Sequence, residues 1–401
     1  MRSVIKKTAA AVLAVILAAS LCGCDRGYIM TVDGMDIRNG VYLSLLNTAY
    51  AMAQDEIKKQ SSDEDNSENE ASSVPVTKGE IDGKNASQWI KEETMKAVRR
   101  FVAVQRKCDE LGLSLTEEEI KEINTNISET WDSENSYLQY LYGYNTMGEY
   151  YESQGIGQES MRAILKVNKL QDKLFMYFYD KGGDLEVTES EMDEYLKDNY
   201  ATVKMQVFSY TDASGAKLEE DDDKKAVKEK AQEYADRINK GEKPVDVFYE
   251  YNMSRAQEAA EAKAETEYTE DNEEGLTKEE WIKQQVEAMN ITKAESEEDL
   301  DRFLSKESSS FDQEVTEYIF NAEIDGKATV FETDSGVYLI IKEDITKKTN
   351  WKEENHENIL NELKGDDFQN MVDLFGQNYE VTADESLINK KYGPEKLDAK
   401  E

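Results

Sequence analysis

Histidine is almost absent from this sequence: His356 is the only one in 401 residues. We therefore expect neither a metal site built from several histidines nor a histidine-dependent hydrolase. Proline is also scarce, with three residues, and this suits a mostly helical chain because proline interrupts helices. Basic residues are outnumbered, with 48 Lys and Arg against 86 Asp and Glu, which gives a formal net charge of −38.

This shortage of basic residues narrows the range of partners. Phosphate binding depends on clustered Lys and Arg, so we expect no nucleic-acid partner. The same charge gives no support for electrostatic attachment to anionic lipid, although it favours solubility. We also expect no cofactor and no metal.

Cysteine is limited to three residues, and two of them, Cys22 and Cys24, end a segment with the features of a signal peptide. Basic residues in "MRSVIKK" precede the apolar run "TAAAVLAVILAAS", which is too short to span a membrane comfortably. The following "LCGC" resembles a bacterial lipobox, which implies cleavage after Gly23 and a diacylglycerol on the sulfur of Cys24. Residues 1–23 would then be a lipoprotein signal peptide. The alternative is an ordinary secreted protein whose two cysteines flank the cleavage site.

The third cysteine, Cys108, has no partner in the exported chain, so no disulfide is expected to stabilise it. It lies in "RRFVAVQRKCDELGL", where we expect it to pack as a small apolar group. A nucleophilic role is not expected, because nothing nearby marks a base that would activate the thiol.

The first half of the exported chain is predicted to be mainly helical. A short strand at 29–32 and a turn precede a helix that starts near Asn39. Thr116 and Thr188 are each followed three residues later by glutamate, which is the capping-box pattern of a helix start. These features predict a helical domain over residues 24–194.

One polar stretch interrupts this domain. Residues 55–84 are acidic and serine-rich with one proline, so we predict that they are disordered. The alternative to disorder is a calcium-binding loop formed by "DEDNSENE" within this stretch. It is not favoured, because the run lacks the glycine and the ligand spacing of an ordered calcium loop.

The second half has a different pattern. "ATVKMQVFSY" alternates apolar and polar residues as a half-buried strand does, and a charged helix follows over 221–239. "FETDSGVYLII" predicts a turn that leads into an apolar strand. We therefore expect a small α/β module over 195–348, with an acidic, loosely packed insertion at 255–308. Residues 349–401 are expected to form a C-terminal helix and tail.

The order of these segments resembles the PrsA and SurA class of exported foldases. The resemblance rests on the lipobox, "VDGMDI", "LGLSLTEEEI", "GIGQESMRAIL", "EVTESEMDEYL" and the α/β module, and it covers nearly all of the exported chain. It implies an α+β fold: a mostly helical SurA-N-like chaperone domain, with a parvulin-like module inserted before a C-terminal helix that packs back on it. Residues 55–84 and 255–308 depart from the pattern.

The resemblance also identifies the positions of a parvulin active site, and here the sequence departs from the family. Val207 and Tyr338 stand where the family has its two histidines, and Phe311 and Val315 stand where it has the Met and Phe of the proline pocket. The barrier to rotation about the peptide bond is ~18–20 kcal/mol, and a site must favour the twisted amide to lower it. Without both histidines, we expect prolyl isomerase activity to be weak or lost.

The resemblance implies a lipid-anchored chaperone on the extracytoplasmic face of the cell membrane. Its partners would be unfolded or partly folded exported polypeptides, and a homodimer is also open. Clients would bind in a groove with adaptable Met and Tyr side chains. The candidate groove residues are Tyr140, Tyr142, Met147, Tyr150, Tyr151 and Met161.

Three other functions stay open at this point. The first is an active parvulin-type isomerase with a non-standard site, which a proline-peptide assay would reveal. The second is a solute-binding lipoprotein, which would need two α/β lobes with recurring strand–helix units; this sequence has a long helical first half instead. The third is a purely structural surface protein, which would bind no client.

Overall fold

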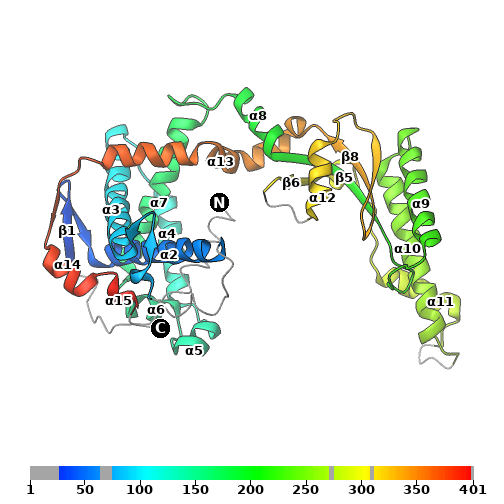
Figure 1. The fold of residues 1–401 in the computed structure, drawn as a ribbon, viewed down its shortest axis with the longest axis horizontal. Coiled ribbons are helices and arrows are strands. Elements are labelled where there is room, and N and C mark those ends of the chain that lie inside the picture. Colours follow the sequence, from blue (N-terminus) through cyan, green and yellow to red (C-terminus); the bar gives the residue numbers. More distant parts are fainter. Residues whose placement is uncertain (1–26, 64–74, 271–274, 308–310, 399–401) are drawn as a thin grey trace. The chain divides into compact units, whose positions relative to one another are not determined.

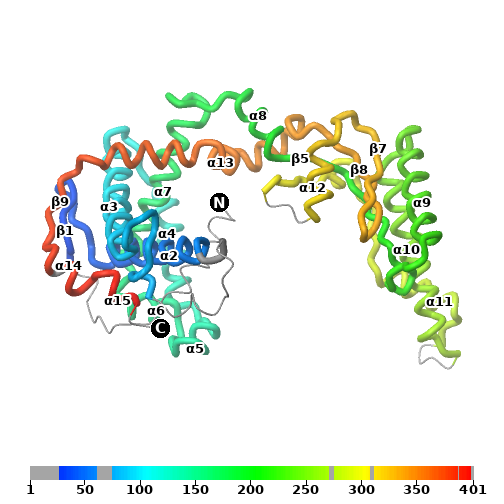
Figure 2. The backbone as a smooth tube through the Cα atoms, in the orientation of Figure 1, coloured from blue at the N-terminus to red at the C-terminus, as the bar shows by residue number. Residues whose placement is uncertain are grey.

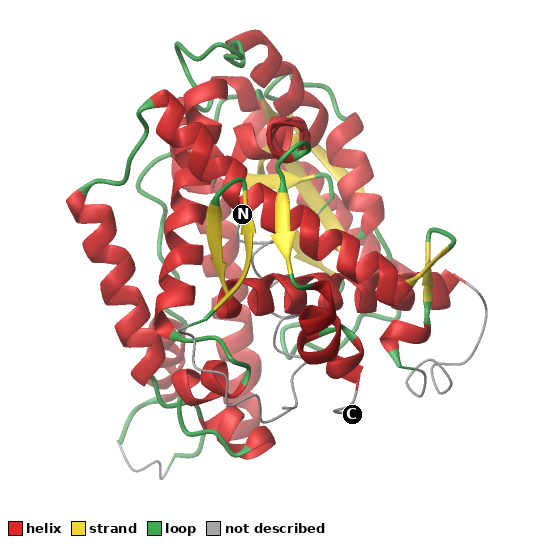
Figure 3. Ribbon diagram, turned by 90° about the vertical axis from the view of Figure 1, so that its left-hand side faces the viewer, coloured by secondary structure: helices red, strands yellow, loops and turns green. Residues whose placement is uncertain are grey.

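The structure, a computed structural model, describes residues 27–63, 75–270, 275–307 and 311–398. These described residues divide into two compact units: those up to Val187, with those from Glu357 onward, form the first unit, and those from Thr188 to His356 form the second. Helices make up most of the described chain, and the strands are gathered in small sheets (Figure 3). The predicted class, α+β and mostly helical, is therefore confirmed.

Three long helices pack together in the first unit and carry most of its core (Figure 1). They are α2 (Asn39–Asp63), α3 (Ala86–Leu111) and α7 (Gln158–Tyr179). The remaining elements before α7 are β1 (Tyr28–Val32), β2 (Met35–Arg38), η1 (Val76–Lys78), β3 (Glu80–Ile81), β4 (Lys84–Asn85), α4 (Glu117–Asp132), α5 (Ser136–Tyr142) and α6 (Met147–Ser153). The capping box predicted at Thr116 is present at the start of α4, where the Thr116 hydroxyl accepts from the backbone N–H of Glu119.

The C-terminal part of the chain returns to the first unit. α13 (Thr349–Gly376) begins in the second unit and continues into the first, where Phe368 packs edge-on against Phe175 of α7. β9 (Val381–Ala383) then pairs antiparallel with β1, so two strands about 350 residues apart lie side by side (Figure 2). Two short helices, α14 (Glu385–Tyr392) and α15 (Glu395–Asp398), complete the chain that the structure describes.

The prediction of disorder over 55–84 is wrong at both ends of that range. α2 continues to Asp63, and Ile57 packs against the core of the first unit. Val76 and Ile81 are buried in the same core, so residues 75–84 are anchored as well. Their apolar side chains are few, but each one reaches the core. Residues 64–74, which hold most of "DEDNSENE", lie outside the described residues.

The second unit is built on a four-stranded antiparallel sheet with the order β6–β5–β8–β7. Its strands are β5 (Tyr200–Ser209), β6 (Arg302–Ser305), β7 (Ala328–Glu332) and β8 (Gly336–Glu343). Its helical elements are α8 (Glu189–Asn199), α9 (Asp221–Asn239), α10 (Pro244–Glu267), α11 (Lys278–Ala288), η2 (Glu298–Leu300), α12 (Gln313–Asn321) and η3 (Ile345–Lys347). The capping box predicted at Thr188 starts α8.

Helices cover both faces of this sheet (Figure 1). Successive residues of a strand point to opposite faces, so β8 supplies both layers of core. Val337 and Leu339 pack with α9 and α10 on one face, while Tyr338 and Ile340 pack with α12 on the other. The "VYLII" strand is buried on both sides, which explains why it has no polar alternation.

The prediction of a loosely packed insertion at 255–308 is also corrected. α10 extends to Glu267 and buries Ala256, Ala260 and Ala264 along one side. At the other end of the stretch, Arg302–Ser305 form β6 and pair with β5 as part of the central sheet. The alanine spacing is helical, and the four-residue strand is too short for its alternation to stand out in the sequence.

Candidate functional site

The four positions that the resemblance assigns to a parvulin site lie in one cluster of the second unit. Val207 of β5 and Tyr338 of β8 are direct cross-strand partners, and Phe331 of β7 is the partner of Tyr338 on its other side. Phe311 and Val315 pack against the same α12 face of the sheet. The structure therefore brings together residues that the sequence separates by more than 100 positions.

This cluster is apolar in character. Val315 and Ile319 are fully buried, Tyr338 is 9% exposed, and the ring of Tyr318 stacks on Phe331 with centroids 4.3 Å apart. The chain's one histidine, His356, lies in α13 and not in this cluster. Such a cluster can pack or hold an apolar group, but it has no imidazole to orient or polarise a twisting amide.

A buried ion-pair network lies elsewhere on the same sheet, and the sequence did not reveal it. The Nζ of Lys204 on β5 is 2.9 Å from Oδ1 of Asp301 and 2.5 Å from Oε1 of Glu343. Lys348 approaches the same two carboxylates, with 2.6 Å to Oδ2 of Asp301. Lys204 is 3% exposed, so two cations and two anions share a largely desolvated site. Strand alternation places Lys204 among the polar residues of β5, but its partners lie 97 and 139 residues away.

The ionisation of Glu343 reflects this network. Burial alone would raise the pKa of its carboxyl, but hydrogen bonds from Lys204 and Lys348 outweigh burial and hold the pKa below its usual value. Burial likewise works against the charge of Lys348, and its two carboxylate partners more than offset this, so its pKa is raised. Glu343 and Lys348 are therefore both held in their charged forms.

The tyrosine-rich segment around α5 and α6 of the first unit is a second candidate site. Leu138 and Tyr150 form its buried centre, with Tyr142, Tyr144 and Met147 packed around them. The ring of Tyr150 lies 5.8 Å from that of Tyr144 in an edge-on arrangement. Most of these aromatic residues therefore pack on one another.

The structure separates the six predicted groove residues by exposure. Tyr140 is 86% exposed and stands on the outside of α5, whereas Tyr150 is 2% exposed. Placing Tyr150 on a client surface is therefore incorrect for this structure, because its ring fills the centre of the cluster and burial raises the pKa of its hydroxyl. Tyr142, Met147 and Tyr151 are half-buried and pack around Tyr150. Met161 is half-buried too, but it packs against the neighbouring cluster of Ile127 and Trp131.

Two further exposed residues belong with Tyr140, although they were not predicted. Tyr137 is 60% exposed and Leu141 is 42% exposed, and both lie on α5. Residues three and four apart share a helix face, so Tyr137, Tyr140 and Leu141 form one patch. We call these three residues the α5 patch. Leu138, which is fully buried, fixes the helix beneath it.

The structure describes Cys108 but not Cys24, the predicted lipidation site. Cys24 lies outside the described residues. Cys108 is buried in α3, and its Sγ lies 3.6 Å from the carbonyl oxygen of Leu170. Burial raises the pKa of its thiol to about 11, so the thiolate needed for a nucleophile is scarce at neutral pH.

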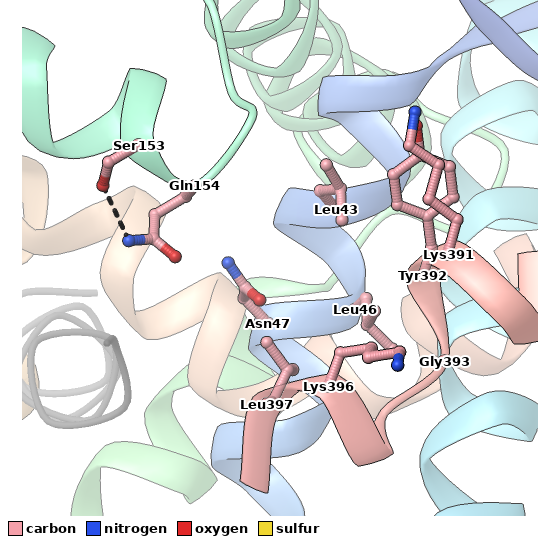
Figure 4. A pocket seen from close by; sticks show the side chains of 10 residues that line it. All are labelled: Leu43, Leu46, Asn47, Ser153, Gln154, Lys391, Tyr392, Gly393, Lys396 and Leu397. Carbon is pink, nitrogen blue, oxygen red and sulfur yellow. Dashed lines mark hydrogen bonds between the residues drawn. The ribbon is translucent and has the colours of Figure 1, made fainter. Parts of the chain in front are cut away.

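A small cavity lies where the C-terminal helices meet α2 and the end of α6. Leu43, Leu46 and Asn47 of α2 face Tyr392 and Leu397 there, and Gln154 donates to Ser153 at its edge (Figure 4). The cavity measures about 20 Å³, which is enough for one water molecule and too little for a ligand. We therefore treat it as part of the core.

The described residues contain no group of three or more His, Cys, Asp and Glu placed to hold a metal ion. Within the same residues, no helix combines the length and the apolar character needed to cross a membrane.

Comparison with known proteins gives structural matches alone. No protein-family model matches the chain, and no curated protein sequence is significantly similar to it. One matching crystal structure is PrsA from Bacillus subtilis, with 14% identity over 78% of this chain and 94% of that chain and a TM-score of 0.26. Another is the foldase protein PrsA from Streptococcus pneumoniae, with 16% identity over 76% of this chain and 90% of that chain and a TM-score of 0.30. Values this low do not carry a function from those proteins to this chain.

Proposed function

We propose that this protein is an exported, membrane-anchored chaperone that binds unfolded segments of other exported proteins. The observation that carries the proposal is the α5 patch, which exposes two aromatic rings and a leucine on a helix anchored by a buried neighbour. Exposed apolar patches of this kind are typical of interaction surfaces. The signal-peptide features and "LCGC" support export and a lipid anchor at Cys24, which mass spectrometry of the N-terminal peptide would test.

The net charge of −38 supports the same proposal. A chaperone must expose apolar side chains without aggregating, and strong charge of one sign keeps such a protein dispersed. A short patch of aromatic and aliphatic side chains also suits clients of varied sequence, because apolar contacts need no fixed hydrogen-bond pattern.

The mature protein is expected to slow the aggregation of an unfolded client at stoichiometric ratios. A suitable measurement is light scattering from reduced, denatured α-lactalbumin. Changing Tyr137, Tyr140 and Leu141 together to serine should weaken client binding by about 10-fold or more, because each change removes about 1–2 kcal/mol of apolar burial. Most of the protection should then be lost.

A control changes exposed apolar residues that lie away from α5. Tyr177 is 40% exposed and Leu374 is 62% exposed, so their double serine variant also removes one exposed aromatic and one exposed aliphatic side chain. It should protect the client as the unchanged protein does. Unaltered aggregation with the unchanged protein, or equal protection by the triple variant, would reject the proposal.

The apolar cluster around Tyr338 leads to a separate prediction about isomerase activity. Because Val207 and Tyr338 bring no imidazole to the cluster, cis–trans isomerisation of a proline peptide should proceed at the uncatalysed rate. Isomerisation monitored by fluorescence would measure this directly, with Tyr338→Phe as the comparison. A rate clearly above background that Tyr338→Phe abolishes would show instead that the hydroxyl supports catalysis.

A further inference from the structure

A pocket of about 510 Å³ lies in the first unit. It is formed by helices from the N-terminal part of the chain together with a strand and a helix from the C-terminal part. Its lining comes from α2, α3, β9 and α14. Tyr42, Met95, Val381 and Ile388 supply apolar surface, and these residues belong to or pack against the core of the unit. The volume falls in the range of small-ligand sites and holds one or two amino-acid side chains.

The charged residue that distinguishes this pocket is Arg99 of α3. Its Nε is buried and has no hydrogen-bond partner among the described residues. The neighbouring Arg100, in contrast, donates from both Nε and Nη2 to the carboxylate of Asp373. A buried guanidinium N–H without an acceptor is costly, so Arg99 lines the pocket with hydrogen-bonding capacity that the described residues do not use.

The other charged residues of the pocket limit which ligand fits. Lys91 pairs with Glu395 at 3.6 Å, and Glu92 pairs with Lys84 at 2.8 Å, so each already has a partner. Glu385 adds a negative charge to the lining. One available guanidinium beside two carboxylates suits a ligand with a single negative charge, because a phosphate or a run of acidic residues would meet repulsion.

We propose that this pocket binds an extended polypeptide segment of another protein through one carboxylate placed next to apolar side chains. The planar guanidinium of Arg99 matches a carboxylate geometrically and forms charge-assisted hydrogen bonds with it. The apolar neighbours of the carboxylate then occupy the surface formed by Met95, Val381 and Ile388. The carboxylate is either an Asp or Glu side chain or the C-terminus of a chain.

This inference goes beyond the proposed chaperone function. The α5 patch is apolar and lies on α5, whereas this pocket lies on other elements and selects for charge. The two can therefore fail independently: aggregation assays report the α5 patch, and the titrations below report the Arg99 pocket.

Isothermal titration calorimetry with unlabelled peptides tests the inference on the mature protein. One pair is acetyl-Ser-Leu-Asp-Leu-Ser-amide and its Asn counterpart, and the other is acetyl-Ser-Gly-Leu-Leu with a free or an amidated C-terminus. In at least one pair, the carboxylate form should bind about 10- to 100-fold more tightly than its neutral form, as expected for a hydrogen bond to a charged group. The pair that shows the difference identifies the source of the carboxylate.

Arg99→Met keeps the aliphatic stem and removes the charge, so it should abolish the preference for the carboxylate form while its melting temperature stays at or above that of the unchanged protein. Arg99→Lys, which retains charge without the planar fork, should keep only part of the preference. The matched control is Lys390→Met, which removes an exposed cation of α14 outside the pocket lining. Equal binding of charged and neutral peptides, no binding of any peptide at millimolar concentration, or a preference that survives Arg99→Met would each overturn the inference.

Discussion

Replacing Lys204 by methionine is expected to lower the free energy of unfolding of the second unit by about 3–5 kcal/mol. Lys204 is 3% exposed and contacts both Asp301 and Glu343, so its removal leaves the buried carboxylate of Asp301 and the partly buried one of Glu343 with only Lys348 between them. A buried charge without a partner is far more costly than the pair is stabilising, because desolvation is no longer offset.

Hydrogen exchange of the β5 and β8 amides measures this effect within the second unit, whatever the first unit does. Lys228→Met is the matched control, because Lys228 pairs with Glu332 on the surface and both side chains are about half exposed. That change should cost no more than about 1 kcal/mol. If Lys204→Met is as mild as Lys228→Met, the network does not stabilise the sheet.

A double variant distinguishes two effects of Lys204→Met: the loss of an attractive ion pair, and the cost of a buried carboxylate left without its partner. Lys204→Met with Asp301→Leu removes one cation and one anion, so Lys348 and Glu343 remain as a neutral pair. Replacing buried ion pairs by apolar residues is often neutral. The double variant should therefore be more stable than Lys204→Met alone. A lower stability would show that Asp301 stabilises the second unit even without Lys204.

Local patterns in the sequence predicted much of the fold, because they depend on residues near one another in the chain. Thr116 and Thr188 begin helices since the capping box needs only a glutamate three residues later. The "VYLII" strand follows from its apolar run. Gly336 starts this strand, and the structure shows why a side chain does not fit there: a Cβ would lie 2.5 Å from the carbonyl oxygen of Phe208.

Other features depend on contacts that spacing cannot show. Residues 302–305 form a strand only because β5 offers them a partner about 100 residues earlier. Tyr150 and Tyr140 look alike in the sequence, yet one fills a core and the other faces solvent, since α5 and α6 pack against each other. Arg99 and Arg100 are likewise alike in the sequence. They differ in the structure because Asp373 of α13 accepts hydrogen bonds from Arg100.

The second large effect concerns pH and the helix pair α7 and α13 of the first unit. Burial raises the pKa of Asp172 on α7 from its usual 3.8 to about 6, and the negative charge of Glu357 on α13 adds to this, while Lys169 opposes it. The folded state therefore holds this proton more tightly than the unfolded state. Stability is highest below the unfolded pKa and is lost as pH rises through the folded pKa.

Asp172→Asn removes that loss and should raise the free energy of unfolding at pH 7.5. A shift of about two pKa units corresponds to roughly 3 kcal/mol, but the carboxyl is only partly buried and solvent screening reduces the gain to about 1–2 kcal/mol. The gain should fall to roughly half at pH 5, because the wild-type carboxyl is then mostly protonated in the folded state.

Urea unfolding followed by tryptophan fluorescence measures this prediction if Trp281 and Trp351 are first replaced by phenylalanine, since Trp89 and Trp131 then report on the first unit. Asp184→Asn is the matched control: Asp184 is an exposed carboxylate in the loop after α7, and its loss should change stability by less than about 0.5 kcal/mol at either pH. Glu357→Gln should give a smaller gain than Asp172→Asn, because it removes the repulsion but leaves Asp172 to be desolvated. A gain that is independent of pH would mean that the amide packs better than the carboxylate, and that titration of Asp172 does not limit the stability of the first unit.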